Sequence, residues 1–176
     1  MDKYRIKFIE DTEVDAGLNR KLIKILSVCF DDQPVFKQRR YYKEMPGCRW
    51  YIEENEQIIA HTALHEKNIL LDSRLLKICG IAEVCVLPEY RGKGLVKLIL
   101  KKIDQWLIDN NYKYAMLFGD ENVYSSSGYF NIDNEIKYVD YETKETKTEI
   151  IKCAMVKKLS EEPWPAGLVD LMGPTF

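Results

Sequence analysis

The residues best placed to do chemistry form a short basic turn with two glycines, Arg91-Gly92-Lys93-Gly94. It follows an apolar run that ends at Leu87 and opens an amphipathic segment from Leu95 to Asn110, so it is predicted to join a strand to a helix. Such a junction directs backbone N–H groups and the positive end of a helix dipole at one point, which favours anions and most often phosphate. Glycine has no Cβ, so a ligand can approach the backbone closely. The turn therefore predicts a phosphate-binding loop.

The composition limits the classes of protein in which such a loop would occur. The chain has 176 residues, with 26 Lys and Arg against 28 Asp and Glu, so no bulk positive charge argues for nucleic acid. No apolar stretch follows the basic start Met1–Arg5, which argues against a signal peptide. No apolar run approaches the ~20 residues of a membrane span. We therefore expect a cytoplasmic protein that binds neither nucleic acid nor membrane.

The thiols and imidazoles predict neither a metal site nor a catalytic cysteine. The five cysteines are scattered and form no CxxC motif, which is typical of reduced, mostly buried side chains in a cytosolic protein. The two histidines, His61 and His65, lie in a predicted strand. Four residues of a strand span ~13 Å, which is too far for one metal ion.

Apolar periodicity predicts an α+β chain with an early helical layer and a mixed sheet. Neither the GxGxxG of dinucleotide-binding folds nor the GxxxxGK[ST] of P-loop proteins occurs. We expect one domain over residues 1–160 and, because residues 161–176 are too apolar for a disordered tail, an ordered segment that packs on the same domain. The expected helices cover residues 15–30, 35–44, 95–110 and 122–127, and the expected strands cover residues 4–9, 49–53, 57–64 with an extension at 68–71, 75–87 with an interruption at Gly80, 114–118, from 129 onward, and 150–156.

Two motifs resemble those of the GNAT superfamily of acyl-CoA-dependent N-acyltransferases. The basic turn resembles motif A, [Q/R]-x-x-G-x-[G/A], with Arg91, Gly94 and Val96 at the fixed positions. Val96 is larger than the usual Gly or Ala, so the helix would sit slightly farther from a pyrophosphate. Motif B has a tyrosine four residues before a Gly-aromatic pair, and here Tyr124 precedes Gly128-Tyr129 in this way. The two motifs in this order are far more specific than motif A alone.

The resemblance implies a single-domain fold whose mixed, mostly antiparallel sheet has helices on both faces. It also implies that acetyl-CoA is the co-substrate and that such a chain can form a homodimer. The pantetheine would pair with the strand edge at Cys85, Val86 and Leu87. The pyrophosphate would rest on Arg91, Gly92, Lys93, Gly94, Leu95 and Val96.

Acyl transfer from a thioester to an amine needs a neutral amine, donors for the tetrahedral oxyanion and a proton for the departing thiolate. The resemblance implies that Tyr124 is the general acid for the thiolate. It also implies an oxyanion donor among the backbone N–H groups near Cys85 or Val86, where a strand bulge frees one. Glu83 is the candidate base, directly or through a water, because an acid in an otherwise apolar strand is unusual.

A narrower resemblance concerns the acceptor. Members of the aminoglycoside 2′-N-acetyltransferase branch end in an aromatic residue whose carboxylate helps to line the substrate site, and this chain ends in Phe176. Asp31, Asp32 and the Phe176 carboxylate are therefore expected to attract a cationic amine. The likeness to that branch rests on Ile58–Ala63, Cys79-Gly80 and the Arg-Gly-x-x-Leu-Val run at 91–96. The sequence leaves three alternatives open: acetylation of a small-molecule amine, acetylation of a peptide or protein, and a non-catalytic acyl-CoA-binding regulatory module.

Overall fold

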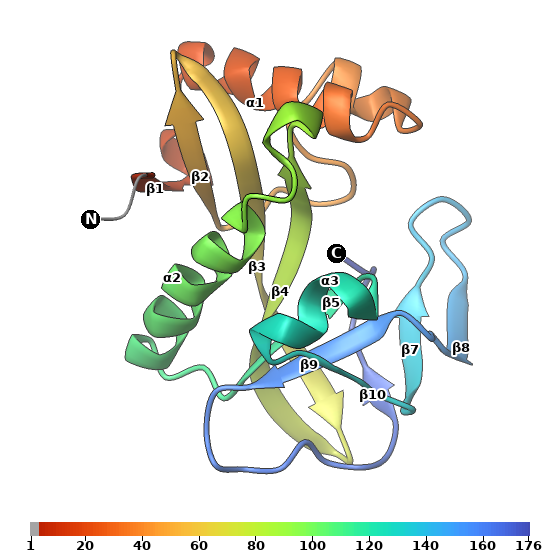
Figure 1. Ribbon diagram of the computed structural model, residues 1–176. Helices are drawn as coiled ribbons and strands as arrows, with labels where there is room; N and C mark the ends of the chain where they lie inside the picture. Colours follow the sequence, from red (N-terminus) through yellow and green to blue (C-terminus); the bar gives the residue numbers. More distant parts are fainter. Residues whose placement is uncertain (1–3) are drawn as a thin grey trace. The chain divides into compact units, whose positions relative to one another are not determined.

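The computed structural model describes residues 4–176, which group into two compact units. The first unit comprises residues 4–65 and Ala82–Ile103, and the second comprises Glu66–Ile81 and Asp104–Phe176. Two long strands and one helix continue from one unit into the other: β3 (Gln57–Leu71), β4 (Arg74–Val86) and α2 (Leu95–Asp109) (Figure 1). Met1–Lys3, on which part of the prediction against a signal peptide depends, lie outside the described residues.

The first unit contains an antiparallel ladder. Strand β1 (Ile6–Glu10) pairs with β2 (Cys48–Glu54), and β2 pairs with the first part of β3. The β2–β3 hairpin closes through Asn55 and Glu56, whose φ angles of 49° and 60° match the right-handed twist of the strands. The strands expected over residues 49–53 and 57–64 are therefore confirmed.

Helix α1 (Ala16–Cys29) packs in the same unit. Asp15 caps its start, because the Asp15 carboxylate accepts a hydrogen bond from the Leu18 N–H at 2.7 Å. One apolar stripe of the helix, Leu22, Ile25 and Leu26, is fully buried. The helix expected over residues 15–30 is therefore confirmed.

The second unit contains the rest of the sheet. Its strands, with its parts of β3 and β4, follow the order β6-β9-β5-β4-β3-β10-β7-β8. Strand β5 runs parallel to β4 and β10 runs parallel to β7, whereas the other described pairs are antiparallel. This confirms the predicted α+β class with a mixed, mostly antiparallel sheet. The remaining elements are β5 (Tyr114–Phe118), α3 (Glu121–Tyr124), β6 (Phe130–Asn131), β7 (Glu135–Val139), β8 (Thr146–Ile150), β9 (Ala154–Lys158) and β10 (Val169–Asp170).

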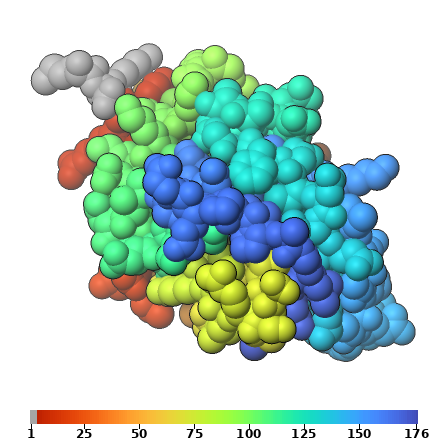
Figure 2. Space-filling view, turned by 90° about the horizontal axis from the view of Figure 1, so that it is seen from below, coloured from red at the N-terminus to blue at the C-terminus, as the bar shows by residue number. Residues whose placement is uncertain are grey.

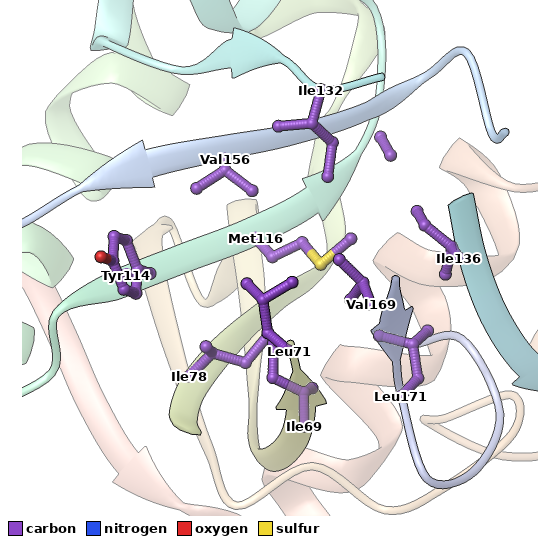
Figure 3. Packing of buried hydrophobic residues seen from close by; sticks show 11 residues of the cluster. Ile69, Leu71, Ile78, Tyr114, Met116, Ile132, Ile136, Val156, Val169 and Leu171 are labelled. Atoms are coloured by element: carbon purple, nitrogen blue, oxygen red, sulfur yellow. The ribbon is translucent and has the colours of Figure 1, made fainter. Parts of the chain in front are cut away.

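One apolar core holds the second unit together. Figure 3 shows side chains of β3, β4, β5, β7, β9 and β10 converging on it. The C-terminal segment joins this core, because the Trp164 ring lies edge-on against Tyr114 at 5.0 Å and the Tyr114 hydroxyl donates to the Pro163 carbonyl at 2.8 Å. Figure 2 shows this segment, in dark blue, beside the yellow β3–β4 hairpin of the same unit, in agreement with the β10–β3 pairing.

Three local predictions differ from the structure. The helix expected over residues 35–44 is only a 3₁₀ turn at Pro34–Lys37, because the Arg40 carbonyl accepts from the Arg49 side chain at 2.9 Å instead of from a helical N–H. The strand expected over residues 150–156 begins at Ala154, since the Ala154 N–H closes a turn to Ile151. Strand β4 continues through Gly80, and its distortion lies at Glu83, which has φ of 51°.

Candidate active site

The predicted phosphate loop lies at the start of α2 in the first unit. Residues 91–94 are exposed, and the Gly94 carbonyl accepts the first helical hydrogen bond from the Leu98 N–H at 3.0 Å. Gly92 and Gly94 both have φ of 72°, and no atom lies within 4 Å of the position that a Cβ would take on either. The backbone is therefore open at the positive end of a 15-residue helix, which is the environment that a phosphate group requires.

The basic side chains of this loop have neighbours in the first unit. The Arg91 Nε donates to the Val86 carbonyl at 3.2 Å, and the Lys93 Nζ lies 4.3 Å from the centre of the Tyr90 ring. Arg91 therefore joins the loop to the end of β4. Val96, the second residue of α2, is partly buried, and Leu95 is buried.

Part of the strand edge that is predicted to bind pantetheine already makes hydrogen bonds within the protein. The Leu87 N–H donates to the Ile59 carbonyl of β3 at 3.0 Å. Successive backbone N–H groups of a strand point to opposite edges, so the Val86 N–H points away from β3. The Val86 carbonyl accepts from Arg91 and from the thiol of Cys29 at 3.5 Å.

Glu83 lies where β4 is distorted, three residues before Val86. Its side chain is only 9% exposed and accepts a hydrogen bond from the Arg49 Nη1 at 3.0 Å. A positive φ in a residue other than glycine costs about 1 to 3 kcal/mol and persists only where the surroundings enforce it. The structure therefore holds this carboxylate in place with a hydrogen bond, on a backbone that is strained.

A buried network surrounds the Glu83 carboxylate in the first unit. Arg49 is fully buried and donates to Asp11 at 2.5 Å. Asp11 also accepts from Arg40, with the shortest contact at 2.6 Å. His61 Nδ1 lies 3.0 Å from the Glu83 carbonyl oxygen, which can only accept, so Nδ1 carries the proton and Nε2 accepts from Arg49 at 3.1 Å.

The network sets the protonation states of its members. Burial raises the pKa of Glu83 to about 7, although the charge and hydrogen bond of Arg49 oppose it. Burial, followed by the charge of Arg49, lowers the pKa of His61 to about 3, so the imidazole is neutral. Burial also acts to raise the pKa of Asp11, but hydrogen bonds from Arg40 and Arg49 outweigh it and the pKa is lowered. Glu83 is therefore the member that exchanges a proton near neutral pH.

Sequence reasoning found Glu83 but missed Asp11, Arg40 and Arg49. The available signal was Arg49 itself, a charged residue at the start of the apolar strand Trp50–Ile52. Its partners Asp11 and Glu83 lie 38 and 34 residues away, so no local pattern connects them. His61 was weighed only as a metal ligand, whereas its two nitrogens contact Arg49 and Glu83.

Tyr124 belongs to the second unit, where it ends α3. Its partly buried ring packs on Gly119: a Cβ at Gly119 would lie 2.4 Å from Tyr124 Cε2. Tyr129 packs edge-on against it, with ring centres 6.1 Å apart and an angle of 69° between the ring planes. Gly128 has φ of 87° and ends the 3₁₀ turn Ser125–Ser127, at the point where the helix expected over residues 122–127 ends. Gly119, which the motifs did not single out, therefore sets the position of the Tyr124 ring.

The three residues predicted to attract an amine fall into different units. Asp31 and Asp32 are exposed in the turn that ends α1, in the first unit. Phe176 belongs to the second unit, where its ring lies against Gly80 and 5.2 Å from the Phe118 ring. A Cβ at Gly80 would lie 2.7 Å from the Phe176 ring, so this glycine permits a close approach. Their part in substrate binding stays a prediction.

Comparisons with known proteins identify the fold. The family model described as an acetyltransferase (GNAT) domain matches residues 7–131. The structure is similar to the GNAT family N-acetyltransferase YhbS of Escherichia coli, solved in complex with CoA, with a TM-score of 0.67 and 17% identity over 96% of this chain and 89% of that one. No curated protein sequence matches the chain.

Two further structures share the fold. A GNAT family acetyltransferase of Brucella melitensis, in complex with acetyl-CoA, has a TM-score of 0.59 and 14% identity over 94% of each chain. A probable N-acyltransferase of Enterococcus faecalis has a TM-score of 0.61 and 18% identity over 76% of this chain but only 33% of its own. The chain belongs to the GNAT acetyltransferase family. Within residues 4–176, no helix has the length and apolar character that crossing a membrane requires.

Proposed function

We propose that the chain transfers an acetyl group from acetyl-CoA to a primary amine of a small cationic molecule, by direct attack of the amine on the thioester. One observation carries this proposal. Glu83, a carboxylate whose pKa is raised to about 7 mainly by burial, lies on the same strand that leads into the exposed glycine loop. A base on the segment that leads into an exposed glycine loop at a helix N-terminus suits acyl transfer from a phosphate-bearing coenzyme to an amine.

The glycine loop fits the coenzyme's pyrophosphate. The open space above Gly92 and Gly94 and the helix terminus behind them suit an anion, and Arg91 and Lys93 add positive charge. Bound acetyl-CoA supplies the acetyl group as a thioester, which an amine can attack. YhbS and the Brucella protein were crystallised with CoA and acetyl-CoA, which supports the same co-substrate here.

Three groups of the chain carry the proton and charge changes in this proposal. Glu83 accepts a proton from the ammonium of the substrate, directly or through a water, because a pKa of about 7 makes it a usable base at neutral pH. The Val86 N–H, on the edge of β4 that faces away from β3, donates to the developing oxyanion. Tyr124 gives its hydroxyl proton to the departing thiolate.

The acceptor side of the proposal rests on charge and on the resemblance to the aminoglycoside 2′-N-acetyltransferase branch. Asp31 and Asp32 are exposed acids in the first unit and would attract a cationic amine, and Phe176 would line the substrate site. We place the enzyme in the cytoplasm and include a homodimer in the proposal, as its family resemblance implies.

Thiol release from acetyl-CoA across a panel of aminoglycosides, polyamines, amino acids and peptides tests the function, with mass detection of the acetylated product. We expect at least one small cationic amine to release thiol above the hydrolysis background. Acetylation of peptides alone would favour a peptide acetyltransferase. Binding of acetyl-CoA without any product would favour a regulatory module, and both results would contradict the proposal.

Replacing Tyr124 by Phe tests the acid role separately. The variant keeps the ring on Gly119 and removes only the hydroxyl, so we expect kcat to fall by about 10²- to 10⁴-fold with little change in acetyl-CoA affinity. Val123→Ala, at the exposed neighbouring position, is the matched control and should leave kcat unchanged. An unchanged kcat in Tyr124→Phe would remove the acid role.

A further inference from the structure

Arg49 lies at the centre of the buried network of the first unit, and the proposed mechanism gives it no role. Its side chain is fully buried. All three nitrogens of its guanidinium have partners: Nε donates to Asp11 at 2.5 Å, and Nη2 donates to the Arg40 carbonyl at 2.9 Å. Nη1 contacts both the Glu83 carboxylate at 3.0 Å and His61 Nε2 at 3.1 Å. Because the guanidinium is planar and rigid, these contacts leave it one orientation.

The network holds Glu83 at two points. Its carboxylate accepts from Arg49, and its backbone carbonyl accepts from the Nδ1–H of His61 at 3.0 Å. The second contact lies at the residue whose φ is 51°. Since Arg49 and His61 also contact each other, one connected pair holds both the side chain and the strained backbone of Glu83. A base held in this way is already in place when an amine arrives.

Asp11 reaches Glu83 through Arg49. It is fully buried and accepts hydrogen bonds from both Arg49 and Arg40. The network thus holds two guanidinium groups and two carboxyl groups, together with the neutral imidazole of His61. Because hydrogen bonds lower the pKa of Asp11 and keep it ionised, one positive charge remains for Glu83 to balance when it loses its proton. Asp11 and Glu83 therefore compete for the charge of Arg49.

We propose that Arg49 and Asp11 are positioning residues for the proposed acyl transfer: Arg49 holds the Glu83 carboxylate in the orientation from which it accepts the proton, and Asp11 acts on that carboxylate through Arg49. The inference rests on the proposed function, because it names the residues that keep the base of that reaction in place. Removing the charge of Asp11 leaves Arg49 to Glu83 alone, which favours the ionised carboxylate. Removing the charge of Arg40 has the opposite effect.

Titration of Glu83 by carbon-13 NMR of the full chain tests the action of Asp11 and needs no substrate. The signal of the Glu83 carboxyl carbon is assigned by its absence in Glu83→Gln. We expect its titration midpoint to lie about 1 pH unit lower in Asp11→Asn than in the wild type, and about 0.5 pH unit higher in Arg40→Gln. Arg74→Gln is the matched control, because it makes the same substitution at an exposed arginine of the second unit and should leave the midpoint unchanged.

The opposite directions of the two shifts separate this role from a structural one. Burial is the main cause that raises the pKa of Glu83, so a variant that only loosens the unit admits water and lowers the midpoint. A rise in Arg40→Gln therefore requires charge that acts through the network. The Arg40 side chain is 19% exposed, so this variant disturbs the fold less than a change at the fully buried Asp11. A midpoint that falls or stays unchanged in Arg40→Gln would overturn the inference.

Arg49→Lys tests the positioning role itself. Lysine keeps the buried positive charge but has no planar fork, so it cannot hold Asp11, His61 and Glu83 at once. With the amine that the wild type acetylates fastest in the panel above, we expect kcat to fall by about 10- to 100-fold while the Kd for acetyl-CoA is unchanged. Near-UV circular dichroism checks the fold, and Arg74→Lys is the control. A folded Arg49→Lys with wild-type kcat contradicts the inference, and where this variant does not fold, the Arg40→Gln titration still decides it.

Failure of the proposed function has a different signature, because the wild type would then release thiol with no amine of the panel. In that case the claim about kcat falls with it. The titrations of Asp11→Asn and Arg40→Gln alone then decide whether Asp11 acts on Glu83 through Arg49.

Discussion

Glu83 combines a strained backbone, a buried carboxyl and one guanidinium partner. Its pKa of about 7, set first by burial, lies above the ordinary value of 4.5. A group whose folded pKa is raised contributes stability that is complete below the unfolded pKa and is lost as the pH rises through the folded pKa. Ionisation of Glu83 therefore costs stability progressively between about pH 4.5 and pH 7.

Glu83→Gln removes this ionisation while its amide oxygen can still accept from Arg49. The quantity to compare is the difference in unfolding free energy between the variant and the wild type. We expect this difference to shift in favour of the variant by up to about 3 kcal/mol between pH 4 and pH 9. The variant should also lose turnover, including the rise in activity that we expect the wild type to show near pH 7. Urea unfolding at the two pH values measures the first effect, and a pH–rate profile measures the second. The same stability difference at both pH values would contradict the assigned pKa.

At the scale of single residues, the sequence identifies candidate functional residues that differ in type from their immediate neighbours in the chain. The glycines of the loop and the acid in the apolar strand stand out from their neighbours, and the structure places them together in the first unit. The guanidinium of Arg49 could not be assigned to Glu83 and Asp11, because hydrogen bonds between residues more than 30 positions apart depend on how the strands pair.

At the scale of helices and strands, the predicted elements were confirmed where helix caps, turn residues and apolar periodicity indicated the same bounds. Helix α1 has both its cap and its stripe, and β5 has the predicted bounds Tyr114–Phe118. The segment after Pro34 failed because tertiary contacts override a helical pattern: Arg40 donates to Asp11, and its carbonyl accepts from Arg49. Long-range hydrogen bonds thus decided the conformation of this segment.

The turn from β5 into α3 makes a prediction about Gly119. Alanine at this position would place a Cβ 2.4 Å from the Tyr124 ring, so the ring has to move. We expect Gly119→Ala to lower kcat by at least about tenfold while the Kd for acetyl-CoA changes little. Gly173→Ala is the control, because no atom lies within 4 Å of its added Cβ. If Gly119→Ala turned over acetyl-CoA as fast as the control and the wild type, catalysis would not depend on the observed position of the Tyr124 ring.

At the scale of the whole molecule, composition and element order predicted the α+β class but could not predict the strand order. Strand β10 has only two residues, and it lies between β3 and β7 in the second unit. Its pairing is parallel to β7 and antiparallel to β3, which no periodicity over two residues can signal. The apolar character of the C-terminal segment predicted that it would be ordered, and Val169 and Leu171 are buried in the core of that unit.

Net charge sets the context for coenzyme binding. The chain carries −2 overall, so the attraction for a polyanionic coenzyme has to come from the loop and the helix terminus rather than from the molecule as a whole. Any ligand that binds only the folded state raises the melting temperature. Acetyl-CoA at about 100 times its Kd should stabilise the fold by about 2.7 kcal/mol, or roughly 5 to 10 °C for a chain of this size.

A thermal melt with acetyl-CoA measures that shift, and it distinguishes a coenzyme site from a protein that only shares the fold. The double variant Arg91→Ala/Lys93→Ala should lose most of the shift relative to its own ligand-free melting temperature. Lys113→Ala is the control: Lys113 is an exposed lysine of the second unit, paired with Glu162 at 2.5 Å, and its variant should keep the shift. Because the attraction is electrostatic at an exposed loop, the shift at a fixed acetyl-CoA concentration should also shrink as salt rises from 0.1 M toward about 1 M, where charges are screened within ~3 Å. A shift that ignores both salt and the two basic residues would place the coenzyme somewhere other than at the start of α2.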